Sequence, residues 1–183
     1  MYSFDYDDRV KKYYNSFVPV SIDKNYAQKI SQLAKDVSAA KASERHHKID
    51  GRNEFERWNT GFMGEAALEK LFQMKIIEWE TGPSEQFLHP DVPKYKVGIK
   101  SSTEGNAPLV DKVSTYPQII CIVSGLVVYV CGLASVDVLN NSGNINAVKS
   151  YGVIKRGTKT AFDGFEHLVP VNSLEDIKEY KTA

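Results

Sequence analysis

Three residues of this chain have types and surroundings that could carry chemistry, and the first is Glu65. It lies in a segment with helical periodicity, where Trp58 and Phe72 fall within about 20° of it at roughly 100° per residue. An ionised carboxylate on an apolar helix face is unfavourable unless it is paired or binds a metal. Glu65 is therefore a candidate metal ligand. The alternatives are a buried Arg or Lys partner, or solvent at the edge of the apolar stripe.

The other two residues, Asp91 and Lys100, lie in the segment HPDVPKYKVGIKSS, residues 89–102. Asp91 follows a proline. Lys100 ends a short predicted strand in which it faces the same side as Gly98. Carboxylates that hold Mg²⁺ next to a lysine ammonium are the groups that metal-assisted phosphodiester hydrolysis requires. The alternative is a loop aspartate and an edge-strand lysine that discourages aggregation.

The elements that must position these residues follow from the hydrophobic pattern. After an arm over residues 1–20, expected to be loosely packed, apolar residues three and four apart predict a helix from Ser21 to about Ala42. A second helix is predicted over 53–73, so it carries Glu65. Short apolar or alternating runs predict strands over 75–80, 85–89, 95–102, 118–124 and 126–132, and weaker strands over 151–156 and 166–171.

Turn and capping signals complete the prediction. Ser124-Gly125 suits a tight hairpin turn between two strongly apolar strands. A short helix is expected over 108–115, and a terminal helix is expected to begin at the capping-box sequence 172–175. Helices followed mostly by strands and then by a helix indicate a mixed α/β or α+β fold.

This order of elements resembles the PD-(D/E)XK nuclease superfamily, whose fold is restriction endonuclease-like, over about residues 53–133. The resemblance matches Glu65 to the helix glutamate, Pro90-Asp91 to the PD motif and Lys100 to the motif lysine. It implies an αβββαβ core with a mixed central sheet flanked by helices, here with an added N-terminal helix. It further implies a DNA endonuclease in which Asp91, Glu65 and the carbonyl of Ile99 bind Mg²⁺ or Mn²⁺.

The chain departs from the family's pattern at Gly98, where the second acid of the motif is expected. The residues from Asp91 to the motif lysine would span about 30 Å if extended, so the chain must bend near Pro93. A turn over 92–95 would place His89 opposite Gly98. The substitute ligand is expected among His89, Glu85 and Glu80. Without a substitute, the protein would bind nucleic acid or a protein partner and not cleave.

Basic residues are concentrated in two parts of the chain. The first group would form a stripe if the first helix continues, and it consists of Lys41, Arg45, Lys48 and Arg52. The second group lies in a segment with glycine and threonine, and it consists of Lys149, Lys155, Arg156 and Lys159. Both groups could contact phosphates, or they could be solvated charged faces. DNA is the expected partner, with RNA as the alternative, and a homodimer would supply two sites for cutting both strands.

Length and composition exclude several classes of protein. The chain has 183 residues, the length of one domain over 1–183. Its 23 basic residues balance 23 acidic ones, which excludes a histone-like polycation and an acidic mimic of nucleic acid. Two cysteines exclude a zinc site made of cysteines alone. No apolar run reaches the ~18–20 residues of a membrane span, and the charged N-terminus lacks a signal-peptide pattern, so a cytoplasmic protein is expected.

Overall fold

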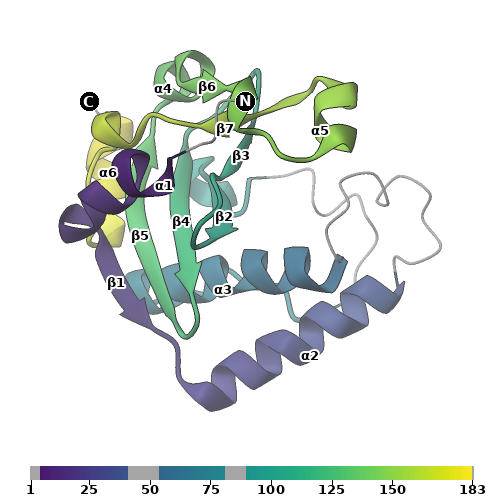
Figure 1. The fold of residues 1–183 in the computed structure, drawn as a ribbon. Coiled ribbons are helices and arrows are strands. Elements are labelled where there is room, and N and C mark those ends of the chain that lie inside the picture. The colour runs from purple at the N-terminus through teal and green to yellow at the C-terminus, as the bar shows by residue number, and fades with distance from the viewer. Residues whose placement is uncertain (1–4, 41–53, 81–89, 183) are drawn as a thin grey trace.

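The fold is built around a four-stranded mixed sheet with the strand order β1-β5-β4-β2 (Figure 1). Its strands are β1 (Val18–Ser21), β5 (Val127–Ala134), β4 (Gln118–Ser124) and β2 (Gly98–Thr103). β2 runs parallel to β4, and the other two pairs of neighbours are antiparallel. β2 is therefore the end of the sheet among the residues that this computed structural model describes, which are 5–40, 54–80 and 90–182.

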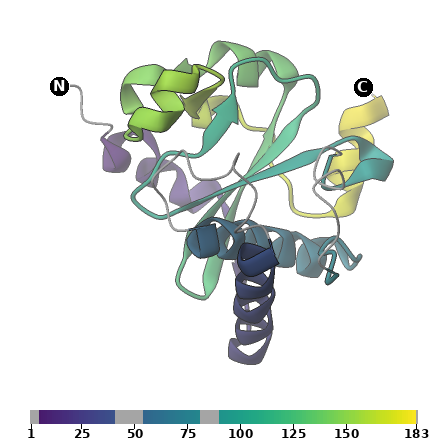
Figure 2. The ribbon, with the colours of Figure 1, turned by 90° about the vertical axis from the view of Figure 1, so that its right-hand side faces the viewer.

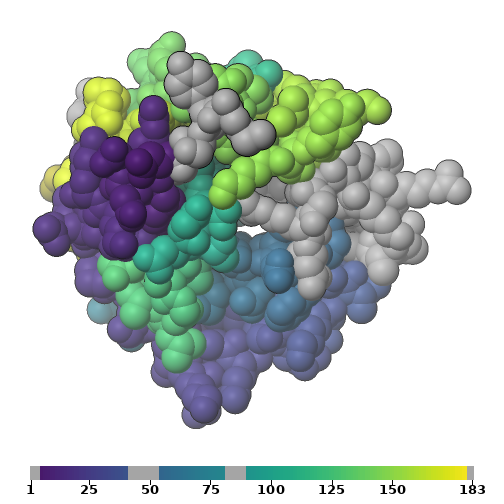
Figure 3. Space-filling model, in the orientation of Figure 1, coloured from purple at the N-terminus to yellow at the C-terminus, as the bar shows by residue number. Residues whose placement is uncertain are grey.

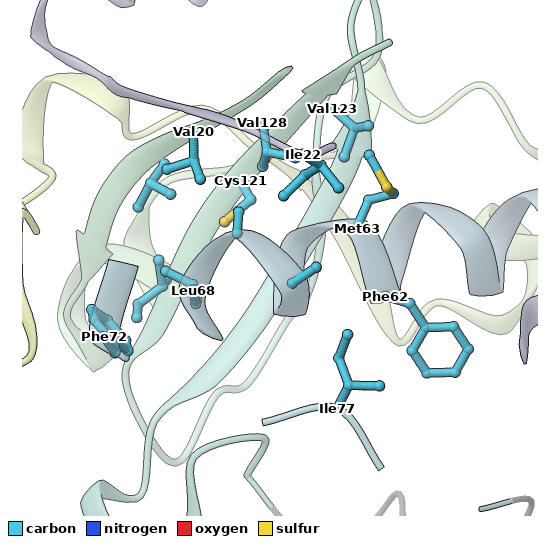
Figure 4. Packing of buried hydrophobic residues seen from close by; sticks show 14 of the residues in the cluster. Val20, Ile22, Phe62, Met63, Leu68, Phe72, Ile77, Cys121, Val123 and Val128 are labelled. Atoms are coloured by element: carbon cyan, nitrogen blue, oxygen red, sulfur yellow. The ribbon is translucent and has the colours of Figure 1, made fainter. Parts of the chain in front are cut away.

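Helix α3 (Glu54–Phe72) covers one face of the sheet, and helix α2 (Lys24–Ala40) packs against α3 on the side away from the strands (Figures 1 and 2). Figure 4 shows Met63 and Leu68 of α3 among the apolar side chains of the core, with Cys121 and Val128 of the sheet. The buried stripe of α2 contains Ile30, Leu33, Ala34 and Val37. Burial of this apolar surface is what holds the two helices to the sheet.

A second, three-stranded sheet covers the opposite face, at the top of Figure 1. Its strands are β3 (Leu109–Asp111), β7 (Lys159–Phe162) and β6 (Gly143–Asn144), in the order β3-β7-β6. Ile120 and Ile122 of β4 pack in a separate core cluster with Val110 and Phe162 of this sheet. β4 thus contributes to a core on each of its two faces, because successive side chains of a strand alternate in direction.

Shorter elements complete the fold. They are α1 (Tyr6–Arg9), α4 (Val136–Asn141), α5 (Tyr151–Arg156), α6 (Leu174–Thr182) and the 3-10 turns η1 (Lys11–Ser16), η4 (Pro93–Tyr95), η5 (Ile145–Ala147) and η6 (Phe165–His167). The described part of the chain contains no helix with the length and apolar character of a membrane-spanning segment.

The main elements of the sequence prediction are confirmed. The two long helices are present as α2 and α3, and the terminal helix is α6. The apolar hairpin is β4–β5, where Gly125 adopts φ +60° in the turn. The mixed α/β class is also confirmed, because helices pack against a sheet with both parallel and antiparallel pairs. The expected flanking by helices is found on one face, whereas the second sheet packs on the other.

Several local predictions were wrong. The predicted arm over residues 1–20 is not loosely packed in its described part, residues 5–20, because Val10 and Phe17 are buried and residues 18–21 form β1. Residues 75–80 form no strand, and the stretch 108–115 contains strand β3 where a helix was expected. In each case the local structure depends on tertiary contacts that the periodicity of the segment does not specify.

The two weaker strand predictions were also wrong. Residues 151–156 form helix α5, which Ser150 caps through its side chain and which ends at Gly157 with φ +67°. The segment 166–171 has no strand beyond an isolated bridge between Val169 and Leu133. Capping residues at both ends of a six-residue segment outweighed its weak strand pattern. The predicted strand over 85–89 lies outside the described residues.

Candidate active site

Asp91 lies at the free side of β2, and a tight turn brings it there. Val92 and Val97 form an antiparallel bridge, so the chain reverses over residues 93–96. The Oδ2 atom of Asp91 accepts a hydrogen bond of 2.5 Å from the backbone N–H of Ile99. The bend near Pro93 is therefore confirmed. The predicted register was wrong, because Asp91 takes the place beside β2 that had been assigned to His89, a residue outside the described part of the chain.

The structure explains the absence of an acid at Gly98. A Cβ atom built on Gly98 would lie 2.8 Å from Cε2 of Tyr116, 3.4 Å from Cγ of Gln118 and 3.6 Å from Oδ2 of Asp91. The space that a side chain of residue 98 would need is thus taken by the Tyr116 ring, and the Asp91 carboxylate lies beside it. Gln118 is buried, and its Oε1 atom has no hydrogen-bond partner among the described residues.

Glu65 shares a pocket with Asp91. The pocket has a volume of about 660 Å³ and is lined by both carboxylates, by the apolar side chains of Phe62 and Ile77, and by Lys96. Glu65 is half-buried on the flank of α3, whereas Gly64, its neighbour in the chain, faces β2. Glu65 therefore does not point into the centre of the core, as the helical wheel suggested, but toward the space between α3 and the turn that carries Asp91.

Glu69, one helical turn after Glu65, holds the segment with Ile76 and Ile77, which lines this pocket. Its Oε1 atom accepts hydrogen bonds of 2.8 Å from the backbone N–H groups of both Ile76 and Ile77. Its Oε2 atom accepts a hydrogen bond from the hydroxyl of Tyr26. The carboxylate therefore fastens the segment after α3 to the helix, which is a structural role.

Lys100 lies on the other face of the sheet from α3. Its partner in β4 is Ile120, which packs in the cluster of the second sheet. The Nζ atom of Lys100 lies 3.8 Å from Oδ2 of Asp111, a residue of β3. Asp111 also lies 3.3 Å from Nζ of Lys159. Asp91, at the sheet edge, thus lies between Glu65 on one side and the Lys100–Asp111–Lys159 group on the other.

The electrostatics of the site couple its three predicted residues through Asp91. Desolvation raises the pKa of Glu65 well above its ordinary value, and the charges of Asp91, Glu69 and Glu78 raise it further. Desolvation also raises the pKa of Asp91, while the Ile99 N–H group and the charge of Lys100 lower it. Although Asp91 reaches the surface, the protein atoms around its carboxylate exclude much of the water.

The backbone carbonyl of Ile99 faces the same edge as Asp91. The N–H group of Gly98 donates to Pro117, toward β4, so the peptide groups of the next residue point the opposite way. The N–H of Ile99 points to Asp91, and its carbonyl shares that direction. The predicted set of oxygen atoms from Asp91, Glu65 and Ile99 is therefore compatible with the fold.

Other predicted site residues are not brought to this place by the described structure. Glu80 is exposed, and Lys149, Lys155 and Arg156 are exposed around α5. Lys159, which the sequence grouped with them, instead joins Asp111 and Lys100. The remaining predicted residues lie outside the described part of the chain: Lys41, Arg45, Lys48, Arg52, Glu85 and His89.

Sequence reasoning missed Asp111 and Tyr116. Asp111 pairs with Lys159 of β7, a strand far away in the chain, and its carboxylate also lies 3.8 Å from Nζ of Lys100. Tyr116 precedes β4, and its hydroxyl has a raised pKa through desolvation and the charges of Asp91 and Asp111. No local pattern indicates either contact, since both depend on segments distant in the sequence.

No family model, curated protein or solved structure matches this chain. Within residues 5–40, 54–80 and 90–182, no group of three or more His, Cys, Asp or Glu side chains is arranged to hold a metal ion. The carboxylates that meet at the pocket are the pair Glu65 and Asp91, with Glu78 nearby.

Proposed function

We propose that this chain is a metal-dependent DNA endonuclease of the restriction endonuclease-like, PD-(D/E)XK type. The observation that carries the proposal is the place of the Asp91 carboxylate. It lines one pocket with Glu65, and it is held by the strand that contains Lys100. Three residues selected from separate parts of the sequence thus belong to one electrostatic group.

The donor set fits Mg²⁺ or Mn²⁺. The charge of Asp91 raises the pKa of Glu65 in the pocket that both residues line, and a divalent cation bound there would relieve this repulsion. Mg²⁺ in particular is commonly held by one or two carboxylates together with substrate phosphate oxygens, so a third protein carboxylate is not required. Asp91, Glu65 and the carbonyl of Ile99 would hold the ion, which supplies Lewis-acid stabilisation of the phosphate and activation of water.

The chain's own residues have distinct parts in this proposal. The Ile99 N–H group orients the Asp91 carboxylate by donating a hydrogen bond to its Oδ2 atom. Lys100, held on β2, would stabilise with its ammonium group the negative charge that develops on the scissile phosphate. Glu69 keeps the segment 76–77 against α3 and so preserves the pocket in which Glu65 lies.

The family comparison is supported by part of the fold. A helix with a glutamate, a turn with Pro-Asp and a strand with a lysine occur in the expected order, and β2 pairs in parallel with β4. Lys100 is the third residue of β2 and does not end the strand as predicted. Two elements differ: residues 75–80 form no strand, and β3 replaces the helix expected before β4. The proposal therefore relies on the grouping of Glu65, Asp91 and Lys100.

The second candidate function is binding of nucleic acid or a protein partner without cleavage. The described residues contain no three-residue metal-ligating group, and the Tyr116 ring takes the space of the missing acid. Cleavage assays and binding assays separate the two functions, because the second predicts retained DNA binding with neither metal binding nor hydrolysis.

Plasmid cleavage with Mg²⁺ and with Mn²⁺ tests the proposal. Asp91→Ala, Lys100→Ala and Glu65→Gln should each lower the rate by about 100-fold or more, the scale of losing one group that stabilises a transition state. Glu56→Gln is the matched control, because Glu56 is an exposed glutamate of the same helix. Unchanged rates in Asp91→Ala and Lys100→Ala would overturn the assignment. DNA binding with no cleavage by the wild type would favour the second function.

A further inference from the structure

One carboxylate, that of Asp111, is shared by two lysines. Asp111 and Lys159 are cross-strand partners in the antiparallel pair β3–β7, and Lys159 Nζ lies 3.3 Å from Asp111 Oδ1. Lys100 Nζ approaches the other oxygen, at 3.8 Å. The side chains of Lys100, Lys159 and Asp111 are 28%, 34% and 43% exposed, so the group is open to a ligand from solvent.

Positive charge exceeds negative charge around this group. Arg57 of α3 also acts on Lys159, although it forms its own ion pair with Glu54 at 3.1 Å. Desolvation and the charges of Lys100 and Arg57 lower the pKa of Lys159, against the opposite effect of Asp111. A second anion next to Lys159 would therefore be attracted to the group.

The surface around Lys159 extends this positive charge. From residue 138 to residue 162 the chain carries four basic residues and no Asp or Glu, although the whole chain is neutral. Lys155 and Arg156 are exposed at the end of α5, which projects at the upper right of Figure 3. Lys112 of the neighbouring strand connection is close by, since a Cβ built on Gly157 would lie 4.0 Å from its Nζ atom.

We propose that Lys159 is a second phosphate-binding lysine, which acts with Lys100 to bind the phosphodiester backbone of DNA, and that the basic end of α5 continues this contact. The choice of DNA as the ligand rests on the proposed function. An array of ammonium and guanidinium groups in which Asp111 is the one neighbouring acid described matches a row of phosphates, whose contacts position the backbone without reading sequence. Asp111 holds both lysines in place until the phosphate arrives.

The competing explanation is a cross-strand ion pair that only stabilises the second sheet, by about 0.2–1 kcal/mol. The two explanations predict different effects of charge-neutralising substitutions on the affinity for DNA. If Lys159 and Asp111 serve only each other, neutralising either residue leaves DNA affinity unchanged. If Lys159 binds phosphate, neutralising Lys159 weakens DNA binding, whereas neutralising Asp111 removes a competing anion and strengthens it.

The test is fluorescence anisotropy of labelled single- and double-stranded DNA oligonucleotides, without divalent metal, over a series of salt concentrations. Lys159→Gln should weaken binding about three- to tenfold and reduce the slope of log K against log[salt] by about 1. Asp111→Asn should tighten binding, and Lys159→Arg should retain it. Lys178→Gln is the charge-matched control, on α6 at the side of the molecule away from α5 in Figures 1 and 2.

Equal affinity and equal salt slope in wild type, Lys159→Gln and Asp111→Asn would overturn the inference, provided that circular dichroism shows all variants folded. If Asp111→Asn does not fold, the difference in DNA affinity between Lys159→Gln and Lys159→Arg is sufficient to test the inference. The outcome is separate from that of the proposed function. Loss of binding in Lys159→Gln without any cleavage by the wild type supports the inference and rejects the nuclease. Cleavage that depends on Asp91 but not on Lys159 supports the nuclease and rejects the inference.

Discussion

The carboxylate of Asp91 accepts a hydrogen bond from the backbone N–H of Ile99, the residue directly before Lys100. This bond joins the turn after Pro90 to the end strand of the sheet. It also fills a hydrogen-bonding position on β2 that faces away from β4. The Asp91 side chain therefore accepts a hydrogen bond from the edge of β2 and holds a charge that acts on both Glu65 and Lys100.

The hydrogen bond between Asp91 and the Ile99 N–H group predicts a difference in stability between two variants at Asp91. Asp91→Asn keeps an oxygen acceptor for the Ile99 N–H group, whereas Asp91→Ala leaves that group unpaired within the protein. Asp91→Ala should therefore unfold with a free energy about 1–3 kcal/mol lower than Asp91→Asn, as measured by urea denaturation. Equal unfolding free energies for the two variants would show that the bond does not stabilise the fold.

Two glycines of α3 should respond in opposite ways to alanine. A Cβ atom on Gly64 would lie 1.9 Å from Oγ and 3.1 Å from Cβ of Ser101, whereas a Cβ atom on Gly61 meets nothing within 4 Å. Gly64→Ala should destabilise the protein by about 1–3 kcal/mol through overpacking. Gly61→Ala should stabilise it by up to about 1 kcal/mol through helix propensity. Thermal and urea unfolding measure both, and a Gly64→Ala protein as stable as Gly61→Ala contradicts the close packing.

Restoring an acid at Gly98 should fail because of Tyr116. The Gly98 position leaves 2.8 Å between a new Cβ atom and Cε2 of Tyr116. We expect Gly98→Asp to lower the unfolding free energy by about 1–3 kcal/mol, and Tyr116→Ala to reduce that loss when both changes are combined. A double-mutant cycle by urea denaturation gives the coupling energy. Additive effects of the two changes would mean that the ring is not the obstacle.

The raised pKa of Glu65 predicts a pH-dependent stability. Because its carboxyl group favours the protonated form in the fold, its contribution is complete below the ordinary value of 4.5 and is lost as pH rises through the higher folded-state pKa. Wild type should therefore lose stability relative to Glu65→Gln as pH rises from about 4.5, with a slope of at most about 1.4 kcal/mol per pH unit. Denaturation of both proteins at several pH values measures this difference. A constant difference, like that expected for Glu56→Gln, contradicts the burial of the charge.

Divalent metal should relieve the repulsion between Glu65 and Asp91. Mn²⁺ at about 100 times its dissociation constant should stabilise the wild type by about 2.7 kcal/mol and raise its melting temperature. Glu65→Gln and Asp91→Asn should show little or none of this shift, whereas Glu56→Gln should retain it. Differential scanning calorimetry with Mn²⁺, and with EDTA as the reference, measures the effect. The same shift in all four proteins would indicate a metal site elsewhere.

Local patterns were sufficient for the elements that bury a long, regular apolar surface. The stripe of Ile30, Leu33 and Val37 predicted α2, and the two apolar runs on either side of the Ser124-Gly125 turn predicted β4 and β5. They were insufficient for the short segments. Strand β3 was predicted as a helix because three residues carry little periodicity, and only pairing with β7 decides their conformation.

The sequence by itself determined the mixed α/β class and the identity of three candidate residues, Glu65, Asp91 and Lys100. Their unusual surroundings are local: a carboxylate among apolar residues, an acid after proline, and a lysine on a strand. Only the tertiary structure decided that Tyr116 takes the space at Gly98 and that Asp111 joins Lys100 to Lys159. The physical reason is that these contacts form between strands and loops that are distant in the chain. Side-chain packing and strand pairing determine which residues meet there, and the local periodicity of the sequence does not indicate them.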